Sequence, residues 1–195
     1  MIPKLSQIGL KLNSNKCEVA FLSASSDNSL LPTLSSVLPD LKVRSKCNLT
    51  LFNSPIFYES INSATTKYEV IVNSICNKIK TLDPHTGLFF LSHHSSAPRL
   101  NYLLHTAPMH LQPERQQGID DNVKDTAINI SNVQMDDKAW KQASLPVRHG
   151  GVGLCSVGSL ALPCYLSSLN KSEPIVRQLL KQNNLPKFAH LLQAE

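Results

Sequence analysis

The amino-acid sequence predicts a mainly α-helical protein with a small β-containing N-terminal piece, an α+β fold. Two observations support this fold class. Up to about residue 58, apolar residues alternate with polar ones in short runs, which is typical of strands. After residue 58 they recur every three or four positions, which is typical of amphipathic helices. Apolar residues make up 42% of the 195-residue chain, so the sequence can form a hydrophobic core.

Short strands are expected on both sides of a polar turn near the start of the chain. An Asn-rich stretch at residues 13–15 interrupts the alternation there. The alternating apolar residues are Ile8, Leu10, Leu12, Cys17, Val19 and Phe21. Residues 42–58 are expected to form a further extended pair, with a turn at Asn53-Ser54-Pro55. Because one or two strands cannot stand alone, this piece is expected to have exposed edges.

A short helix is expected between the extended segments, at residues 27–41. Asp27 or Asn28 can cap its first turn, Pro32 fits that turn, and Pro39 ends the helix. The rest of the chain is predicted to be helical. Helices are expected at residues 59–82, 85–96, 97–108, 113–131, 136–145, 157–169 and 173–192.

The stretch QASLPVRHGGVGL, residues 142–154, has two possible interpretations. A glycine-rich loop can bind phosphate, but this one lacks the terminal Gly-Lys-Ser/Thr of a P-loop and follows a predicted helix rather than a strand. The favoured interpretation is a connection between helices. Pro146 stops one helix there, and the glycines permit backbone angles and close packing that other residues do not.

Positive charge is concentrated in the first half of the chain. The net charge is +5, and residues 1–104 hold 10 Lys and Arg against 6 Asp and Glu. Cations that flank the extended segments are candidates for binding nucleic-acid phosphates, and a solvated face is the alternative. These candidates are Lys11, Lys16, Lys42, Arg44 and Lys46.

No pattern of metal ligands or of a catalytic relay is evident. The five cysteines form no CxxC pair, so the sequence supports neither a zinc site nor a disulfide framework. His93-His94, His105 and His110 lack HExxH spacing and are interpreted as partly exposed helix or loop residues. The pairs Asp120-Asp121 and Asp136-Asp137 are interpreted as acids at helix N-termini. No signal peptide or membrane span is expected, and an intracellular location in the cytoplasm or nucleus is expected.

An ordered set of motifs resembles the reverse transcriptases of non-LTR retrotransposons. GLKLNSNKCEV, residues 9–19, is similar to motif D of their palm, where Gly-Leu-x-Leu-Asn-x-x-Lys-Cys-Glu follows the catalytic Asp-Asp hairpin. LTLFNSPI, residues 49–56, is similar to motif E, usually Leu-Leu-Gly-x-Pro-Ile. Residues 82–108 and 140–169 resemble the helical region that follows, where Trp-x-Gln-Ala-x-Leu-Pro-x-x-x-Gly-Gly-Leu-Gly-Ile is common. The resemblance covers nearly the whole chain.

The resemblance implies a partial polymerase palm followed by a helical thumb and a helical extension. Residues 1–58 would be the end of the palm, 59–110 thumb-like helices and 111–195 a region after the thumb. Lys16 matches the motif D lysine, which helps to protonate departing pyrophosphate. The residues that match the primer grip are Leu51, Phe52, Asn53, Ser54, Pro55 and Ile56. The implied partner is an RNA or DNA template–primer duplex.

The sequence departs from the family where the chemistry would occur. It has no Tyr/Phe-x-Asp-Asp string, so the aspartates that bind Mg²⁺ in the family are absent, as are the fingers and most of the palm. Asn53 replaces a common glycine, and Cys155 a common arginine. We therefore expect an inactive fragment with no catalytic residue, cofactor, small-molecule substrate or membrane partner, but with residual template–primer binding. The alternative is a non-catalytic helical module that binds nucleic acid or protein.

Overall fold

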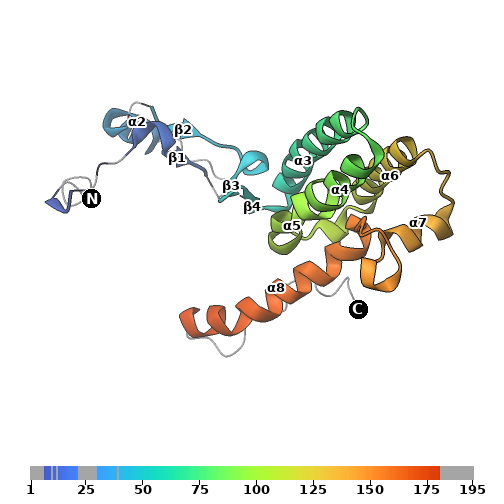
Figure 1. The fold of residues 1–195 in the computed structure, drawn as a ribbon. Helices are drawn as coiled ribbons and strands as arrows, with labels where there is room; N and C mark the ends of the chain where they lie inside the picture. The colour runs from blue at the N-terminus through green and yellow to red at the C-terminus, as the bar shows by residue number, and fades with distance from the viewer. Residues whose placement is uncertain (1–6, 10, 12, 22–29, 39, 181–195) are drawn as a thin grey trace. The chain divides into compact units, whose positions relative to one another are not determined.

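The computed structural model describes residues 7–9, 11, 13–21, 30–38 and 40–180 (Figure 1). These residues are mostly helical, with two small two-stranded sheets, which confirms the predicted mainly α fold with a small β-containing piece. The chain divides into two compact units. The first unit comprises Met1–Leu51 and Pro55–Ser63, and the second comprises Phe52–Ser54 and everything from Ala64 onward.

In the first unit, a parallel strand pair is connected through a short helix. The chain runs through the 3-10 turn η1 (Ser14–Lys16), β1 (Glu18–Val19), α2 (Leu30–Val37), β2 (Lys42–Val43) and the 3-10 turn η2 (Lys46–Asn48). Strands β1 and β2 align Glu18 with Lys42 and Val19 with Val43. A parallel pair needs a crossover connection, and α2 lies within that connection.

The predicted strands and short helix of this unit agree with the structure only in part. Ile8 lies in a turn rather than a strand, because the neighbouring Gly9 has a φ of 76°, in the left-handed region that glycine tolerates. The second predicted strand is shorter than expected, since only Glu18–Val19 pair. Pro32 does lie in the first turn of α2. Leu10, Leu12, Asp27, Asn28 and Pro39 lie outside the described residues.

A tight hairpin follows, made of β3 (Thr50–Leu51) and β4 (Ser54–Pro55). Its two connecting residues, Phe52 and Asn53, have φ values of 50° and 65°. Two successive positive φ angles are the signature of a type I′ turn, whose twist matches that of the strands it joins. The expected turn at Asn53-Ser54-Pro55 was therefore displaced by one residue, because Ser54 and Pro55 belong to β4.

The helical region after the hairpin begins with α3 (Tyr58–Ile79), which starts in the first unit and continues into the second. The remaining elements are α4 (Pro84–His94), α5 (Ser96–Thr106), η3 (Met109–Leu111), α6 (Pro113–Ser131), α7 (Asp137–Ser144), η4 (Val147–His149) and α8 (Val157–Leu180). Most of the predicted boundaries agree with these to within a few residues. From Ala64 onward the chain forms one compact unit, and the predicted division at residue 110 stays a prediction.

The prediction of separate helices at 157–169 and from 173 was wrong over the described residues. One helix, α8, runs through both, with Pro163 and Pro174 inside it. A proline removes one backbone N–H from the helix ladder. Both prolines lie on the exposed side, where water can satisfy the carbonyl groups that lose their partners.

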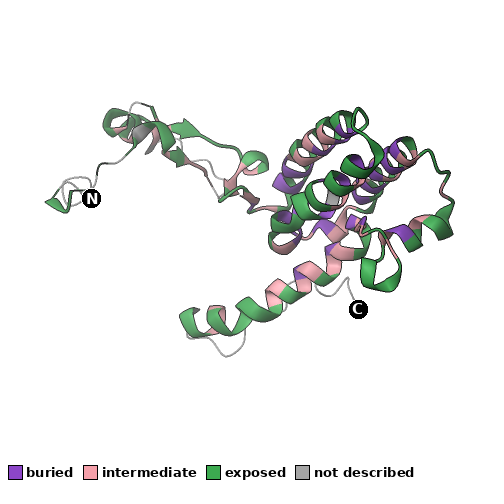
Figure 2. Cartoon of the chain, in the orientation of Figure 1, coloured by how far each residue is buried: buried purple, intermediate pink, exposed green. Residues whose placement is uncertain are grey.

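The core of the second unit is formed by leucine and valine side chains from several helices. Helix α5 packs mainly on α8, and α4 packs on α6. The fully buried side chains include Leu91, Leu100, Leu103, Leu104, Val123 and Val157. Figure 2 shows the buried residues gathered on α3 to α6 and on the first part of α8, whereas the later part of α8 is largely exposed.

Candidate nucleic-acid interface

The glycine-rich stretch forms a closed connection between α7 and α8. The backbone N–H groups of six consecutive loop residues each donate to a backbone carbonyl oxygen within residues 143–153. These donors belong to Gly150, Gly151, Val152, Gly153, Leu154 and Cys155. A phosphate-binding loop needs N–H groups directed at the ligand, and these donors are already used. The structure therefore favours the helix connection.

Glycine is required in this connection for two separate reasons. Gly150 and Gly153 have φ values of 77° and 81°. Gly151 has no room for a side chain, because a Cβ atom there would lie 2.0 Å from the carbonyl oxygen of Leu145. The clustering of glycines follows from backbone geometry and packing.

The N-terminus of α8 is occupied by a carboxylate of the protein itself. Asp120, which is 5% exposed, accepts hydrogen bonds from Val157 N at 2.8 Å, Gly158 N at 3.1 Å and Ser156 Oγ at 2.6 Å. A helix N-terminus favours negative charge, and Asp120 supplies it from α6. Asp120 therefore acts at a helix N-terminus as predicted, but at that of α8 and from within α6, whereas Asp121 lies inside α6 and bonds to Gln117, so the prediction was wrong for Asp121.

The second acidic pair behaves as the sequence predicts. Asp136 is the N-cap of α7, and its Oδ1 accepts a hydrogen bond from Ala139 N at 2.7 Å. Asp137 follows in the first turn and lies 3.2 Å from the ammonium group of Lys124. Both acids stabilise the beginning of α7.

Three of the five predicted phosphate-binding cations lie in the parallel strand pair of the first unit or next to it in the chain. Lys42 is aligned with Glu18, and Lys16 ends the turn two residues before Glu18. Arg44 follows β2 and donates to Glu18 Oε1 from Nε at 3.1 Å and from Nη2 at 2.8 Å. This bond, more than the neighbouring charges of Arg44 and Lys42, holds the pKa of Glu18 below its ordinary value. The structure therefore brings Lys42 and Arg44 together beside one carboxylate, whereas Lys16 is near Glu18 only along the chain.

The other two candidate cations are placed differently. Lys46 lies in η2 with its Nζ 5.7 Å from the ring centre of Phe57, within the range of a cation–π contact. Lys11 is exposed in an irregular segment that no described strand includes. The side-chain ammonium groups of Lys11, Lys16 and Lys42 form no hydrogen bond or ion pair with other residues in the described part of the chain.

The primer grip-like residues form the β3–β4 hairpin and are mostly exposed. Phe52, at its tip, is 83% exposed, and Leu51 and Ile56 are also exposed. Pro55 is buried, and Ser54 Oγ donates to the backbone oxygen of Thr106 at 3.4 Å. The hairpin thus presents an aromatic ring to solvent on a turn whose two central residues are fixed in the left-handed region.

The histidines fit their predicted exposure, and one has a partner that the sequence did not indicate. His93 and His94 are exposed on α4, and His110 contacts the ring of Tyr165. His105 Nδ1 lies 2.7 Å from Ser168 Oγ, a residue 63 positions later in the chain. Nothing in the spacing could have revealed this pair, since it depends on how α5 packs against α8. No carboxylate hydrogen bond to His105 is present among the described residues.

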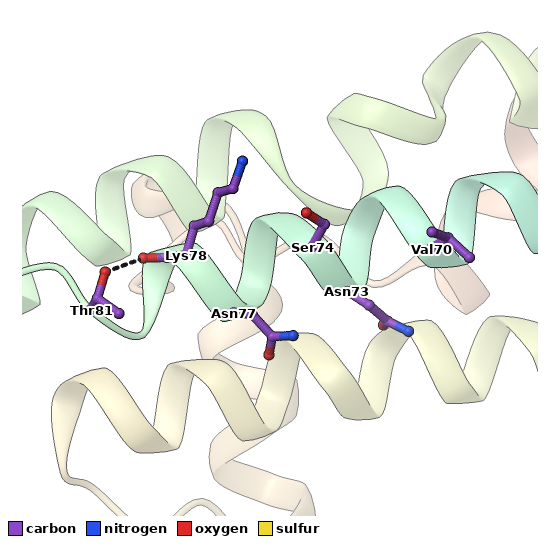
Figure 3. Close-up of a pocket in the computed structure, with 6 residues that line it drawn as sticks. All are labelled: Val70, Asn73, Ser74, Asn77, Lys78 and Thr81. Carbon is purple, nitrogen blue, oxygen red and sulfur yellow. Dashed lines mark hydrogen bonds between the residues drawn. The ribbon is translucent and has the colours of Figure 1, made fainter.

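Two surface hollows along α3 were not predicted from the sequence. The larger, of about 580 Å³, is lined by Val70, Asn73, Ser74, Asn77, Lys78 and Thr81 (Figure 3). The smaller, of about 350 Å³, is lined by Ile75, Lys78, Ile79, Thr81, Leu82, Phe90 and His94. Phe89 and Phe90 on α4 are both exposed.

The described residues contain no group of three or more His, Cys, Asp or Glu side chains that could hold a metal ion. No described helix is long and apolar enough to cross a membrane. The cysteines in the described range are all free thiols. Comparison with protein-family models, with curated proteins and with solved structures gave no match.

Proposed function

We propose that this chain is a fragment related to a non-LTR retrotransposon reverse transcriptase, and that it binds a template–primer duplex without polymerising on it. The observation that supports this proposal best is the conformation of the β3–β4 hairpin. Asn53 stands where motif E usually has glycine, and it has a φ of 65°. Glycine and asparagine are the residues that tolerate this region best, so the departure at Asn53 preserves the turn.

The rest of the architecture is compatible with the same proposal. A short β-containing piece precedes a helical region, which is the order of a palm end (residues 1–58), a thumb (59–110) and a helical extension (111–195). Lys16 is exposed at the end of η1, where a motif D lysine could approach a phosphate. These assignments rest on the resemblance of the motifs.

The proposed activity is binding without chemistry. The Asp-Asp string that binds Mg²⁺ in the family is absent from the printed sequence, and the described residues contain no cluster that fits such an ion. No step of phosphoryl transfer is assigned to this chain. We expect no Mg²⁺-dependent primer extension by the purified chain, and sustained extension of a labelled primer would refute this part of the proposal.

Backbone phosphates are the proposed ligands of the basic residues in the first unit. Each phosphate that a Lys or Arg neutralises releases counterions, which changes the slope of log affinity against log salt by about 0.7 to 0.9. Lys16 and Lys42 are the strongest candidates, because both are exposed beside the β1–β2 pair and neither has a carboxylate hydrogen bond among the described residues. Arg44 contributes less while it is bonded to Glu18.

The test is fluorescence anisotropy with a labelled RNA–DNA hybrid at several salt concentrations. The double variant Lys16→Gln/Lys42→Gln should bind more weakly, with a salt slope flatter by about 1.5. The matched control is Lys138→Gln/Lys141→Gln, which removes the same charge from exposed positions on α7 and should change the slope much less.

Two outcomes would oppose this proposal. Equal effects of the two double variants would show that the whole surface attracts nucleic acid without a defined interface. Absent or salt-independent binding by the unmodified chain would leave the alternative, a helical module whose partner is a protein.

A further inference from the structure

The exposed face of α3 and the adjoining part of α4 carry a set of side chains that the proposed duplex interface does not use. The two hollows on this face share Lys78 and Thr81, so they adjoin along the last turns of α3. Every residue that lines them belongs to the second unit. They can therefore be considered as one surface, which we call the α3–α4 groove.

The larger hollow has a mostly apolar surface, but four of its six lining residues carry uncharged polar groups and one, Lys78, is a cation. Figure 3 shows Asn73 and Asn77 on one side of α3, with Ser74 and Lys78 on the other. Asn122 donates to the side-chain oxygen of Asn73, which holds that amide in place. Amides both donate and accept hydrogen bonds, as the edges of nucleobases and sugars require.

The smaller hollow adds exposed rings to this polar face. Phe90 is 40% exposed, and its ring centre lies 5.6 Å from that of His94. The neighbouring Phe89 is stacked on His93, with ring centres 4.5 Å apart and planes 23° apart. Phenylalanine side chains are usually buried in the core of a protein. Here both rings are partly exposed, and Phe90 lines the smaller hollow together with His94 and Lys78.

The charges of the groove are of one sign. Among the described residues, no carboxylate lines either hollow. Asp83, which precedes α4, is committed to capping that helix through Thr86 N at 3.1 Å. An anionic ligand with flat apolar rings is complementary to this surface, whereas an apolar protein helix would leave the amides of Asn73 and Asn77 without a matching role.

We propose that the α3–α4 groove binds single-stranded nucleic acid. One base stacks on Phe90 and His94 in the smaller hollow, Lys78 contacts an adjacent phosphate, and the amides of Asn73 and Asn77 bind the next nucleotide. Successive bases on aromatic side chains beside a cation form a recurrent mode of single-strand recognition. This site differs from the proposed duplex interface in its ligand and in all of its residues, so either can be wrong without the other.

The experiment titrates the full chain into a single-stranded oligonucleotide that contains 2-aminopurine, whose fluorescence is quenched by stacking. The unmodified protein should quench it saturably. Phe90→Leu keeps an apolar side chain but removes the ring, and it should weaken binding by about 5- to 100-fold. Lys78→Gln should weaken binding and flatten the salt slope by about 0.7.

The matched control is Tyr102→Leu, which removes another exposed ring from the same unit at a position outside both hollows. It should leave the quenching and affinity within about 2-fold of the unmodified chain. Far-UV circular dichroism of each variant checks that the helices are intact. If Phe90→Leu disturbs the fold, Phe90→Trp replaces it as the test variant and should quench at least as well as the unmodified chain.

Two results would overturn the proposal. One is the absence of quenching by the unmodified chain. The other is an equal loss in Phe90→Leu and Tyr102→Leu. The Lys16→Gln/Lys42→Gln variant separates this site from the duplex interface. It should retain the 2-aminopurine quenching even though it binds the hybrid duplex weakly.

Discussion

Replacing Asp120 by alanine should destabilise the second unit strongly. The carboxylate accepts three hydrogen bonds at the beginning of α8, and one of its donors, Val157 N, belongs to a residue with 0% exposure. An unsatisfied buried N–H costs about 1–3 kcal/mol, and loss of a helix cap costs about 1 kcal/mol more. The expected loss in the free energy of unfolding is therefore about 2–4 kcal/mol.

Urea unfolding followed by circular dichroism at 222 nm measures this loss. With a typical slope for a small domain, the midpoint should fall by about 1–2 M urea. Asp121→Ala is the matched control, because it removes a neighbouring carboxylate that is exposed and bonded only to Gln117 Nε2 among the described residues. The control should change stability by no more than about 0.5 kcal/mol.

Asp120→Asn provides a second arm of the same test. The amide keeps one acceptor oxygen, but its NH₂ group faces the other donors. The free energy of unfolding of Asp120→Asn should therefore lie between that of the unmodified chain and that of Asp120→Ala. Equal midpoints for Asp120→Ala and Asp121→Ala would refute the reasoning. That result would mean that the beginning of α8 is held by packing alone and that the carboxylate contributes nothing measurable.

Substitutions at glycines, in the β1–β2 pair and in the hairpin should have measurable effects as well. Gly151→Ala should destabilise the chain by about 3 kcal/mol in urea unfolding, because its Cβ meets a backbone oxygen, whereas Gly118→Ala in open space on α6 should stabilise it by about 1 kcal/mol. Glu18→Gln should release Arg44 and raise the affinity for the RNA–DNA hybrid, with a salt slope steeper by about 0.8; weaker binding would contradict the proposed interface. Phe52→Asn should stabilise the hairpin by about 1 kcal/mol, since a phenylalanine with positive φ is strained. The same variant should weaken hybrid binding if the exposed ring contacts the primer, and unchanged affinity would remove the hairpin from the interface.

Local signals allowed the sequence to predict elements whose ends carry their own chemistry. Residues 113–131 coincide with α6, since Pro113 begins it and Asn132 ends it in the left-handed conformation. Asp136 caps α7 as expected. The prediction of helix ends failed in α8. Two helices were predicted at residues 157–169 and 173–192, yet α8 runs through both with Pro174 on its exposed side.

The features that sequence reasoning missed depend on contacts between distant segments. Asp120 binds residues 36 to 38 positions later, and the His105–Ser168 pair spans 63 positions. The α3–α4 groove depends on which face of each helix the core leaves uncovered. The spacing of apolar residues does not predict that Phe89 and Phe90 lie on the uncovered face. The basic residues could be found by charge, but the bond between Arg44 and Glu18 required the register of β1 and β2.

The same physical need explains both the glycine-rich connection and the buried aspartate. A helix N-terminus exposes N–H groups that require an acceptor, and in phosphate-binding proteins the ligand supplies it. Here Asp120 supplies it permanently, and the loop before α8 satisfies its own donors. An anionic ligand would have to displace a hydrogen-bonded carboxylate from a site that is 5% exposed. The nucleic-acid binding that we propose therefore relies on side-chain cations and rings and not on the N-terminus of α8.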